Sequence, residues 1–173
     1  MQTVPKPTSD EHPPFMGAYV SFSPDENVID NLTQNSEVVK AMMREHSDAF
    51  LSTPHEPGEW TIKQVLLHMM DTERIFTYRA LRFARNDSTE LPGFEQGDYM
   101  PYTGANDRAV EDIIAEYDTI RAASISLITS LDETTHMREG IASGHRMTVR
   151  AAIHIIVGHE LFHLDSITTN YLA

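Results

Sequence analysis

Four segments of the sequence carry apolar side chains at helical spacing, and together they restrict the possible folds more than any other feature. They run from Ser23 to about Phe50, from Thr61 to about Arg85, from about Asp107 to about Leu131, and from Met147 nearly to the C-terminus. Each is about 20 to 27 residues long, and no stretch shows the alternation of a half-buried strand. Because a helix must bury its apolar stripe against another element, the sequence predicts an all-α four-helix bundle.

Helix-start signals mark three of the boundaries. Ser23 stands as an N-cap before Pro24, with Glu26 three residues after the cap. Thr61 and Gln64 have the spacing of a capping box, and Thr148 is expected to cap the last helix. Residues 132–146 are polar, contain two glycines, and are predicted to form a loop or a short hairpin.

The first 22 residues differ in character from the rest of the chain. They hold four prolines and many polar side chains, without a helical period. We expect residues 1–22 to form an extended N-terminal arm, laid over the surface of a single bundle domain at residues 23–173.

Charge and composition exclude several classes of function. A formal net charge of −13 opposes broad contact with nucleic-acid phosphates or anionic lipid. The sequence has no apolar run of about 20 residues that would span a membrane, and it does not begin with a signal pattern. A cytoplasmic protein that binds neither nucleic acid nor membrane is therefore expected. No Cys occurs, so any metal site must use His, carboxylate and water.

The last predicted helix carries two histidines, His159 and His163, four residues apart. This spacing places both imidazoles on one helical face, close enough to share a metal ion. With Glu160 between them, the string H-E-L-F-H matches the H-E-x-x-H pattern of zinc peptidases. A hydrogen-bonded polar core is the alternative, because buried imidazoles need partners of some kind.

A third ligand must come from earlier in the chain. The chain ends ten residues after His163, and that tail offers no ligand, which argues against a peptidase. His68 is the upstream histidine that lies in the middle of a helix on an inward-facing stripe, as bundle metal sites require. His46 is its main competitor, although its position near a helix end favours a role there.

Two carboxylates near these histidines are candidate catalytic residues. Glu160 lies about 100° round the helix from His159, so it would accept a proton from the activated water rather than bind the metal, or it would pair with an arginine. Asp71, three residues after His68, would orient a ligand or hold a water, or it would pair with Arg74 on a solvated face.

The sequence resembles the DinB-like (YfiT-type) superfamily. The resemblance rests on the segment from Trp60 to Arg74, which contains His68, on Leu91-Pro-Gly-Phe94, and on the segment from Gly158 to Ile167, which contains His159 and His163. It implies a four-helix bundle of up-down-down-up topology, with a divalent metal ion held by three histidines that correspond to His68, His159 and His163.

The resemblance also implies a function. Members of the superfamily are described as metal-dependent hydrolases, and relatives as transferases or isomerases that use a low-molecular-weight thiol; many are homodimers. We therefore expect an enzyme that activates water on a small-molecule substrate, with a thiol S-transferase and a non-catalytic metal-binding protein as alternatives. Three imidazoles suit Zn or Ni best, and Fe or Mn also fit.

Overall fold

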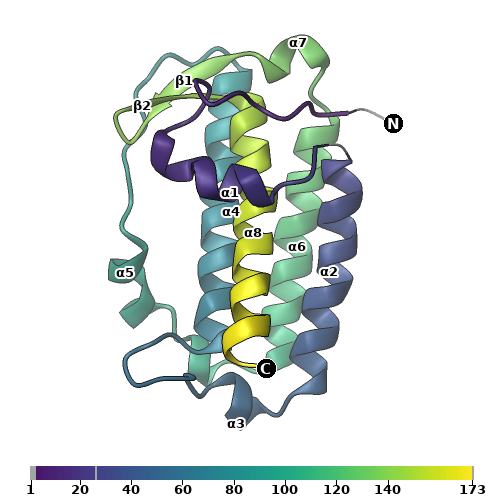
Figure 1. The fold of residues 1–173 in the computed structure, drawn as a ribbon, viewed down its shortest axis with the longest axis vertical. Coiled ribbons are helices and arrows are strands. Elements are labelled where there is room, and N and C mark those ends of the chain that lie inside the picture. The colour runs from purple at the N-terminus through teal and green to yellow at the C-terminus, as the bar shows by residue number, and fades with distance from the viewer. Residues whose placement is uncertain (1–2, 26, 173) are drawn as a thin grey trace.

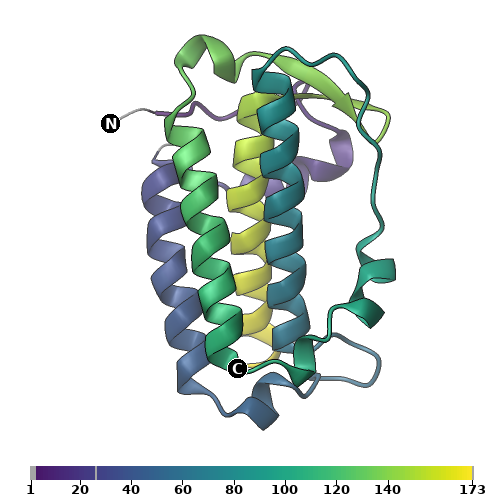
Figure 2. The same cartoon turned by 180° about the vertical axis from the view of Figure 1, so that it is seen from behind.

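Four long helices form the body of the computed structural model, which describes residues 3–25 and 27–172 (Figure 1). They are α2 (Val28–Glu45), α4 (Ile62–Ala84), α6 (Val110–Thr129) and α8 (Val149–Asn170). Figures 1 and 2 show that α2 and α8 run in one direction and α4 and α6 in the other. The predicted four-helix bundle, with its up-down-down-up topology, is confirmed.

Shorter elements fill the connections between the long helices. Helix α3 (Asp48–Leu51) lies between α2 and α4. The crossover from α4 to α6 contains α5 (Gln96–Tyr99) and two 3-10 turns, η2 (Met100–Tyr102) and η3 (Ala105–Asp107). Between α6 and α8, α7 (Glu133–His136) precedes a hairpin of β1 (Glu139–Ala142) and β2 (His145–Thr148), in which Glu139 pairs with Thr148.

Two of the predicted helix starts are correct. The Thr61 hydroxyl accepts a hydrogen bond from the backbone N–H of Gln64, and the Gln64 side chain accepts one from the Thr61 backbone, which completes the capping box of α4. The Thr148 hydroxyl accepts a hydrogen bond from the backbone N–H of Ala151 at the start of α8. Each cap satisfies backbone donors that have no partner within the helix.

The predicted start at Ser23 is wrong. Ser23 ends a short helix instead, and α2 begins at Val28 after Asn27, which has a left-handed backbone with φ of 61°. Glu26, expected to complete the cap, lies outside the described residues. The Ser23 hydroxyl lies 2.8 Å from Nδ1 of His154 in α8, so a tertiary contact outweighs the local capping signal.

Helix α8 lies at the centre of the molecule and is buried on all sides along its first half. From Val149 to Glu160 every residue except Arg150 is buried. A helix that is apolar all round has to be covered all round. The bundle covers one side, and a short N-terminal helix, α1 (Gly17–Phe22), covers the other (Figure 1).

The N-terminal segment is therefore not wholly extended as expected. Its described part, residues 3–22, ends in the 3-10 turn η1 (Pro14–Met16) and in α1. Polar contacts fasten it to α8: Nε2 of His154 donates to the carbonyl oxygen of Val4 over 2.9 Å, and the Glu11 carboxylate pairs with Arg150. The division of the chain into an arm and a bundle domain at residue 22 stays a prediction.

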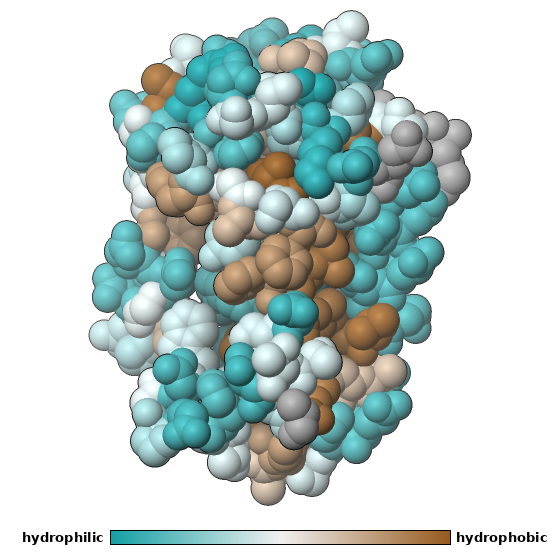
Figure 3. All heavy atoms as spheres, viewed as in Figure 1, coloured by the Kyte–Doolittle hydropathy of each residue, from teal (hydrophilic) through white to brown (hydrophobic). Residues whose placement is uncertain are grey.

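Gly158 allows α1 to lie directly against α8. A Cβ at this position would overlap the backbone carbonyl oxygen of Tyr19 in α1. Figure 3 shows apolar side chains gathered on this face, over α1 and the C-terminal half of α8. In the described part of the chain, no helix is both long enough and apolar enough to cross a membrane.

Candidate metal centre and its cavity

Three imidazoles meet where α4 packs against α8. Nε2 of His159 lies 2.9 Å from Nε2 of His68 and 3.1 Å from Nε2 of His163. One potential ligand atom from each ring lies within 4.8 Å of those of the other two. The two helices thus bring together the three residues that were predicted to share a metal ion.

Burial keeps these rings neutral. His68 and His159 are buried and His163 is half-buried. Loss of solvation lowers the pKa of His68 and of His163 to about 4, and it lowers the pKa of His159 well below its ordinary value. At neutral pH the nitrogens therefore carry lone pairs rather than charge, which is the form that binds a metal ion.

Neighbouring aromatic rings fix the imidazoles in place. Trp60 meets the His68 ring edge-on with centroids 5.2 Å apart, and Tyr19 of α1 meets the His159 ring in the same way at 5.0 Å. Phe162 packs against His163 at 5.3 Å. These contacts limit the rotation of the rings and shield part of the cluster from water.

The spacing of the nitrogens fits a shared divalent ion. Ligand nitrogens about 2.0–2.1 Å from one ion, at octahedral to tetrahedral angles, lie about 2.9–3.4 Å apart. The two measured separations, 2.9 and 3.1 Å, fall in that range. The donor set also fits, because three neutral imidazoles suit Zn, Ni or Fe better than Mg or Ca.

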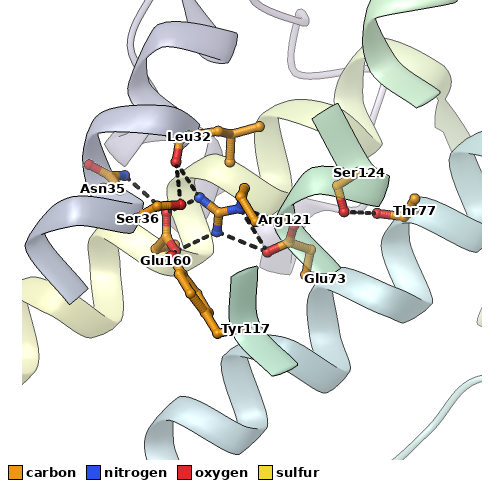
Figure 4. A network of polar contacts seen from close by, with 9 residues as sticks. All are labelled: Leu32, Asn35, Ser36, Glu73, Thr77, Tyr117, Arg121, Ser124 and Glu160. Carbon is orange, nitrogen blue, oxygen red and sulfur yellow. Dashed lines mark hydrogen bonds and ion pairs between the residues drawn. The ribbon is translucent and has the colours of Figure 1, made fainter. Parts of the chain in front are cut away.

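Glu160 is not part of this cluster. Its carboxylate points to another side of α8, into the bundle interior, where Arg121 of α6 donates to it over 2.5 and 3.1 Å (Figure 4). Tyr117 and Asn35 also donate to Glu160, over 2.5 and 3.0 Å. Of the two roles considered for Glu160, the structure shows the pairing with an arginine.

The Glu160 carboxylate belongs to a buried ionic network that spans all four long helices. Arg121 also pairs with Glu73 of α4 at 2.9 Å and donates to the carbonyl oxygen of Leu32 in α2 (Figure 4). Burial alone would lower the pKa of Arg121, but the charges of Glu160 and Glu73 outweigh it and raise that pKa. The network fills the bundle interior, so the imidazoles lie on the far side of the α4–α8 pair.

Asp71 and His46 also lie apart from the imidazoles. Asp71 is half-buried and pairs with Arg74 at 3.2 Å, which is the simpler of the two roles considered for it. Burial raises the pKa of Asp71, and Arg74 opposes the rise. His46 ends α2, where its Nδ1 lies 2.8 Å from the carbonyl oxygen of Met42, so its position is that of a helix-end residue.

A cavity of about 270 Å³ opens beside two of the imidazoles. Its walls come from five separate parts of the chain: the N-terminal segment, α4, the crossover, the hairpin turn and α8. The residues from α4 are His68, Thr72, Phe76 and Arg79; those from α8 are Ile155 and His159. A small organic molecule in this cavity would lie against His68 and His159.

Sequence reasoning missed two features of this cavity. From the sequence, Arg79 would either meet an anionic thiol or, more commonly for a helical arginine, lie on an exposed face, but its side chain is buried, with 3% of its surface exposed. A signal was available, because Arg79 lies eleven residues after His68, about 20° from it round the helix. The contribution of Tyr19 and of the rest of the N-terminal wall had no comparable local signal.

Comparisons with known proteins agree with this fold and site. The family model described as the DinB superfamily matches residues 31–167. A protein of Bacillus licheniformis, named provisionally as a metal-dependent hydrolase, is 23% identical over 144 residues, which cover 82% of each protein.

Two solved structures share the fold. YfiT from Bacillus subtilis superposes on this chain with a TM-score of 0.63 at 18% identity. Its structure report provisionally describes it as a metal-dependent hydrolase, with an unusual four-helix bundle topology. The match covers 82% of this chain and 86% of YfiT. TT2238, a four-helix bundle protein, gives a TM-score of 0.62 at 18% identity over 82% of this chain and 96% of its own.

Proposed function

The chain belongs to the DinB superfamily, and on that basis we propose that it is a metal-dependent enzyme in which His68, His159 and His163 hold one divalent ion. The observation that carries this proposal is the convergence of Nε2 atoms from three neutral imidazoles, two of which line a cavity. We propose hydrolysis of a small amide or ester as its reaction, with Zn or Ni as the preferred ion.

A divalent ion held by three imidazoles supplies a Lewis acid that lowers the pKa of water and polarises a carbonyl group. The protein supplies the rest of the site. The rings of Trp60, Tyr19 and Phe162 hold the imidazoles in position, and the burial of His68 and His159 keeps both rings uncharged at neutral pH, so that one nitrogen of each has a free lone pair. The cavity wall determines which molecules reach the site.

One observation favours the thiol S-transferase as a second candidate. Within residues 3–25 and 27–172, the cluster around the three imidazoles contains no carboxylate, because Glu160 is bound to Arg121 and Asp71 to Arg74. A carboxylate next to the ion would speed hydrolysis by accepting a proton from water, and Glu95, which lines the cavity, lies outside this cluster. A thiol that enters as the thiolate has already lost its proton, so it needs no such group.

Metal content tests the site. Untagged protein, purified without a metal column, should contain close to one equivalent of metal by plasma mass spectrometry. His68→Ala and His163→Ala should each lose it, while His46→Ala, which removes a histidine outside the cluster, should keep it. Wild-type protein that takes up no metal after reconstitution would overturn the proposal.

Turnover assays then separate the two reactions. Hydrolysis of a fluorogenic ester without added thiol would support the hydrolase. Consumption of an electrophile only when a small thiol is present would support the transferase. Whichever of the two activities is found should disappear in His163→Ala and persist in His46→Ala.

The family resemblance also leads us to propose a homodimer. Light scattering coupled to size exclusion tests it, because one chain has a mass of 19.6 kDa and a dimer twice that.

A further inference from the structure

A buried arginine, Arg79, lies in the wall of the cavity. The Arg79 guanidinium donates to two neutral oxygens, the carbonyl oxygen of Pro92 at 3.2 Å and the hydroxyl of Ser143 at 3.0 Å. It also lies over the rings of Phe76 and Phe94, at 4.8 and 5.6 Å from their centroids. In the described part of the chain, no carboxylate forms an ion pair with it.

Burying the positive charge of Arg79 is energetically unfavourable unless a bound anion supplies the opposite charge. Only 3% of the Arg79 surface is exposed, and a buried charge is normally paired. The contrast with Arg121, which is equally buried and pairs with both Glu73 and Glu160, shows how this chain treats a buried arginine elsewhere. Glu95 also lines the cavity, but it is exposed and makes no ion pair with Arg79.

A second polar group in the same wall also lacks a partner. The hydroxyl of Thr72 is buried and has no hydrogen-bond partner among the described residues. Thr72 lies on α4 between His68 and Arg79 and lines the cavity with both of them. A buried hydroxyl without a partner is energetically unfavourable, so this group also points to a ligand that would satisfy it.

The positions on α4 define the shape of that ligand. His68 and Arg79 are eleven residues apart, so they share one face of the helix and their Cα atoms are separated by about 16 Å along its axis. The Arg79 side chain leans back toward His68, because side chains on a helix tilt toward its N-terminus. The wall between them includes the apolar side chains of Phe76 and Ile155.

We propose that Arg79 binds the carboxylate of an elongated substrate whose opposite end lies against His68 and His159. The Thr72 hydroxyl hydrogen-bonds to a polar group in the middle of the molecule, and Phe76 and Ile155 contact its apolar part. A planar carboxylate is the anion that matches the fork of an arginine. This assignment rests on the proposed function for its reactive end but not for the carboxylate site itself.

Binding of hexanoate and of its uncharged analogue hexanamide tests the assignment directly. Wild-type protein should bind hexanoate at least about tenfold more tightly than hexanamide, as measured by ligand-observed NMR or calorimetry. Arg79→Gln should lose this preference. Arg82→Gln is the matched control, because Arg82 lies one turn further along α4, pairs with Asp87, and does not line the cavity.

Further results decide the outcome. Equal affinity of wild-type protein for hexanoate and hexanamide would overturn the proposal without any variant, as would an unchanged preference in folded Arg79→Gln. If Arg79→Gln does not fold, Arg79→Lys replaces it. This variant keeps the charge and should retain part of the preference for hexanoate. Complete loss of the preference in folded Arg79→Lys would count against a charge-based site. His163→Ala should keep the full preference even though the proposed metal site is lost, so failure of the two proposals can be distinguished.

Discussion

His159 and Glu160 are neighbours in the sequence, but their side chains point to different sides of α8. The imidazole faces the cavity beside α1, and the carboxylate faces the interior of the bundle. The 100° step between successive helical residues makes this separation possible. The H-E-x-x-H string therefore supplies two imidazoles to one site and a buried anion to another.

Glu160→Gln should lower stability without removing the metal. The amide keeps some hydrogen bonds to Arg121 and Tyr117 but loses the charge that Arg121 pairs with, so the free energy of unfolding should fall by about 1–3 kcal/mol. Chemical denaturation measures the change, and plasma mass spectrometry should find the same metal content as in wild-type protein.

Asp71→Asn is the control for this substitution, since the half-exposed pair with Arg74 contributes at most about 1 kcal/mol. Unchanged stability of Glu160→Gln, together with loss of metal or of turnover, would return Glu160 to the catalytic site.

At the scale of elements, contact between α1 and α8 depends on Gly158. Gly→Ala in the middle of a helix normally stabilises a protein by about 0.5–1 kcal/mol. At Gly158 the sign should reverse, because the new Cβ would overlap the carbonyl oxygen of Tyr19. Gly158→Ala should lower the free energy of unfolding and increase amide hydrogen exchange in residues 14–22.

Gly97→Ala is the matched control, because a Cβ at Gly97 in α5 would meet nothing within 4 Å. Equal exchange in residues 14–22 of Gly158→Ala and of wild-type protein would show that α1 does not need this close approach.

Docking of the N-terminal segment should also weaken in acid, through His154. Its Nε2–H donates to Val4, so Nδ1 must accept from Ser23, and the ring is buried and neutral. Burial lowers the pKa of His154 to about 4, and the nearby charges of Lys6 and Arg150 add to the effect. A histidine with a depressed folded-state pKa contributes full stability above its unfolded-state pKa of about 6.5, and that contribution is lost as the pH falls toward 4.

Between pH 7 and pH 5 this histidine should account for about 2 kcal/mol of lost stability. His154→Gln should lose correspondingly less over the same range, as measured by urea denaturation at both pH values. Glu11→Gln should keep the wild-type difference, because Arg150 holds the pKa of Glu11 at about 2, below the range tested. A wild-type pH dependence in His154→Gln would assign the effect to other histidines.

Local signals predicted the elements that local chemistry determines. The capping box at Thr61, the N-cap at Thr148 and the helical periodicity were sufficient to locate α4 and α8. The spacing of His159 and His163, together with the lack of a downstream ligand, indicated His68 as their neighbour, and the structure brings the three together. That they bind a metal stays a proposal.

Features that depend on distant partners could not be predicted in this way. Ser23 has a good capping sequence, but its hydroxyl bonds to His154, which lies 131 residues further along the chain. His136 belongs to a polar segment whose sequence predicts exposure, yet only 1% of its surface is accessible. In both cases the environment of the residue comes from packing between segments, which no local pattern records.

At the scale of the whole molecule, the proposed metal ion would join two helices whose ligands lie 91 residues apart in sequence. His68 belongs to α4 and the other two histidines belong to α8. An ion that binds only the folded chain stabilises it by an amount that depends on its free concentration. The site should therefore be visible in the thermal stability of the entire protein.

Removal of metal should lower the melting temperature of wild-type protein by several degrees. At a free ion concentration of about one hundred times the dissociation constant, binding contributes about 2.7 kcal/mol, which corresponds to about 5–10 °C for a chain of this size. Calorimetry with and without a chelator measures the shift, and re-addition of the ion should restore the melting temperature.

His163→Ala should melt at the same temperature with and without the chelator, because two remaining imidazoles hold the ion weakly. His46→Ala should shift as wild-type protein does. An equal shift in His163→Ala would mean that the ion acts elsewhere on this acidic surface, and the three imidazoles would then be explained by hydrogen bonding among themselves.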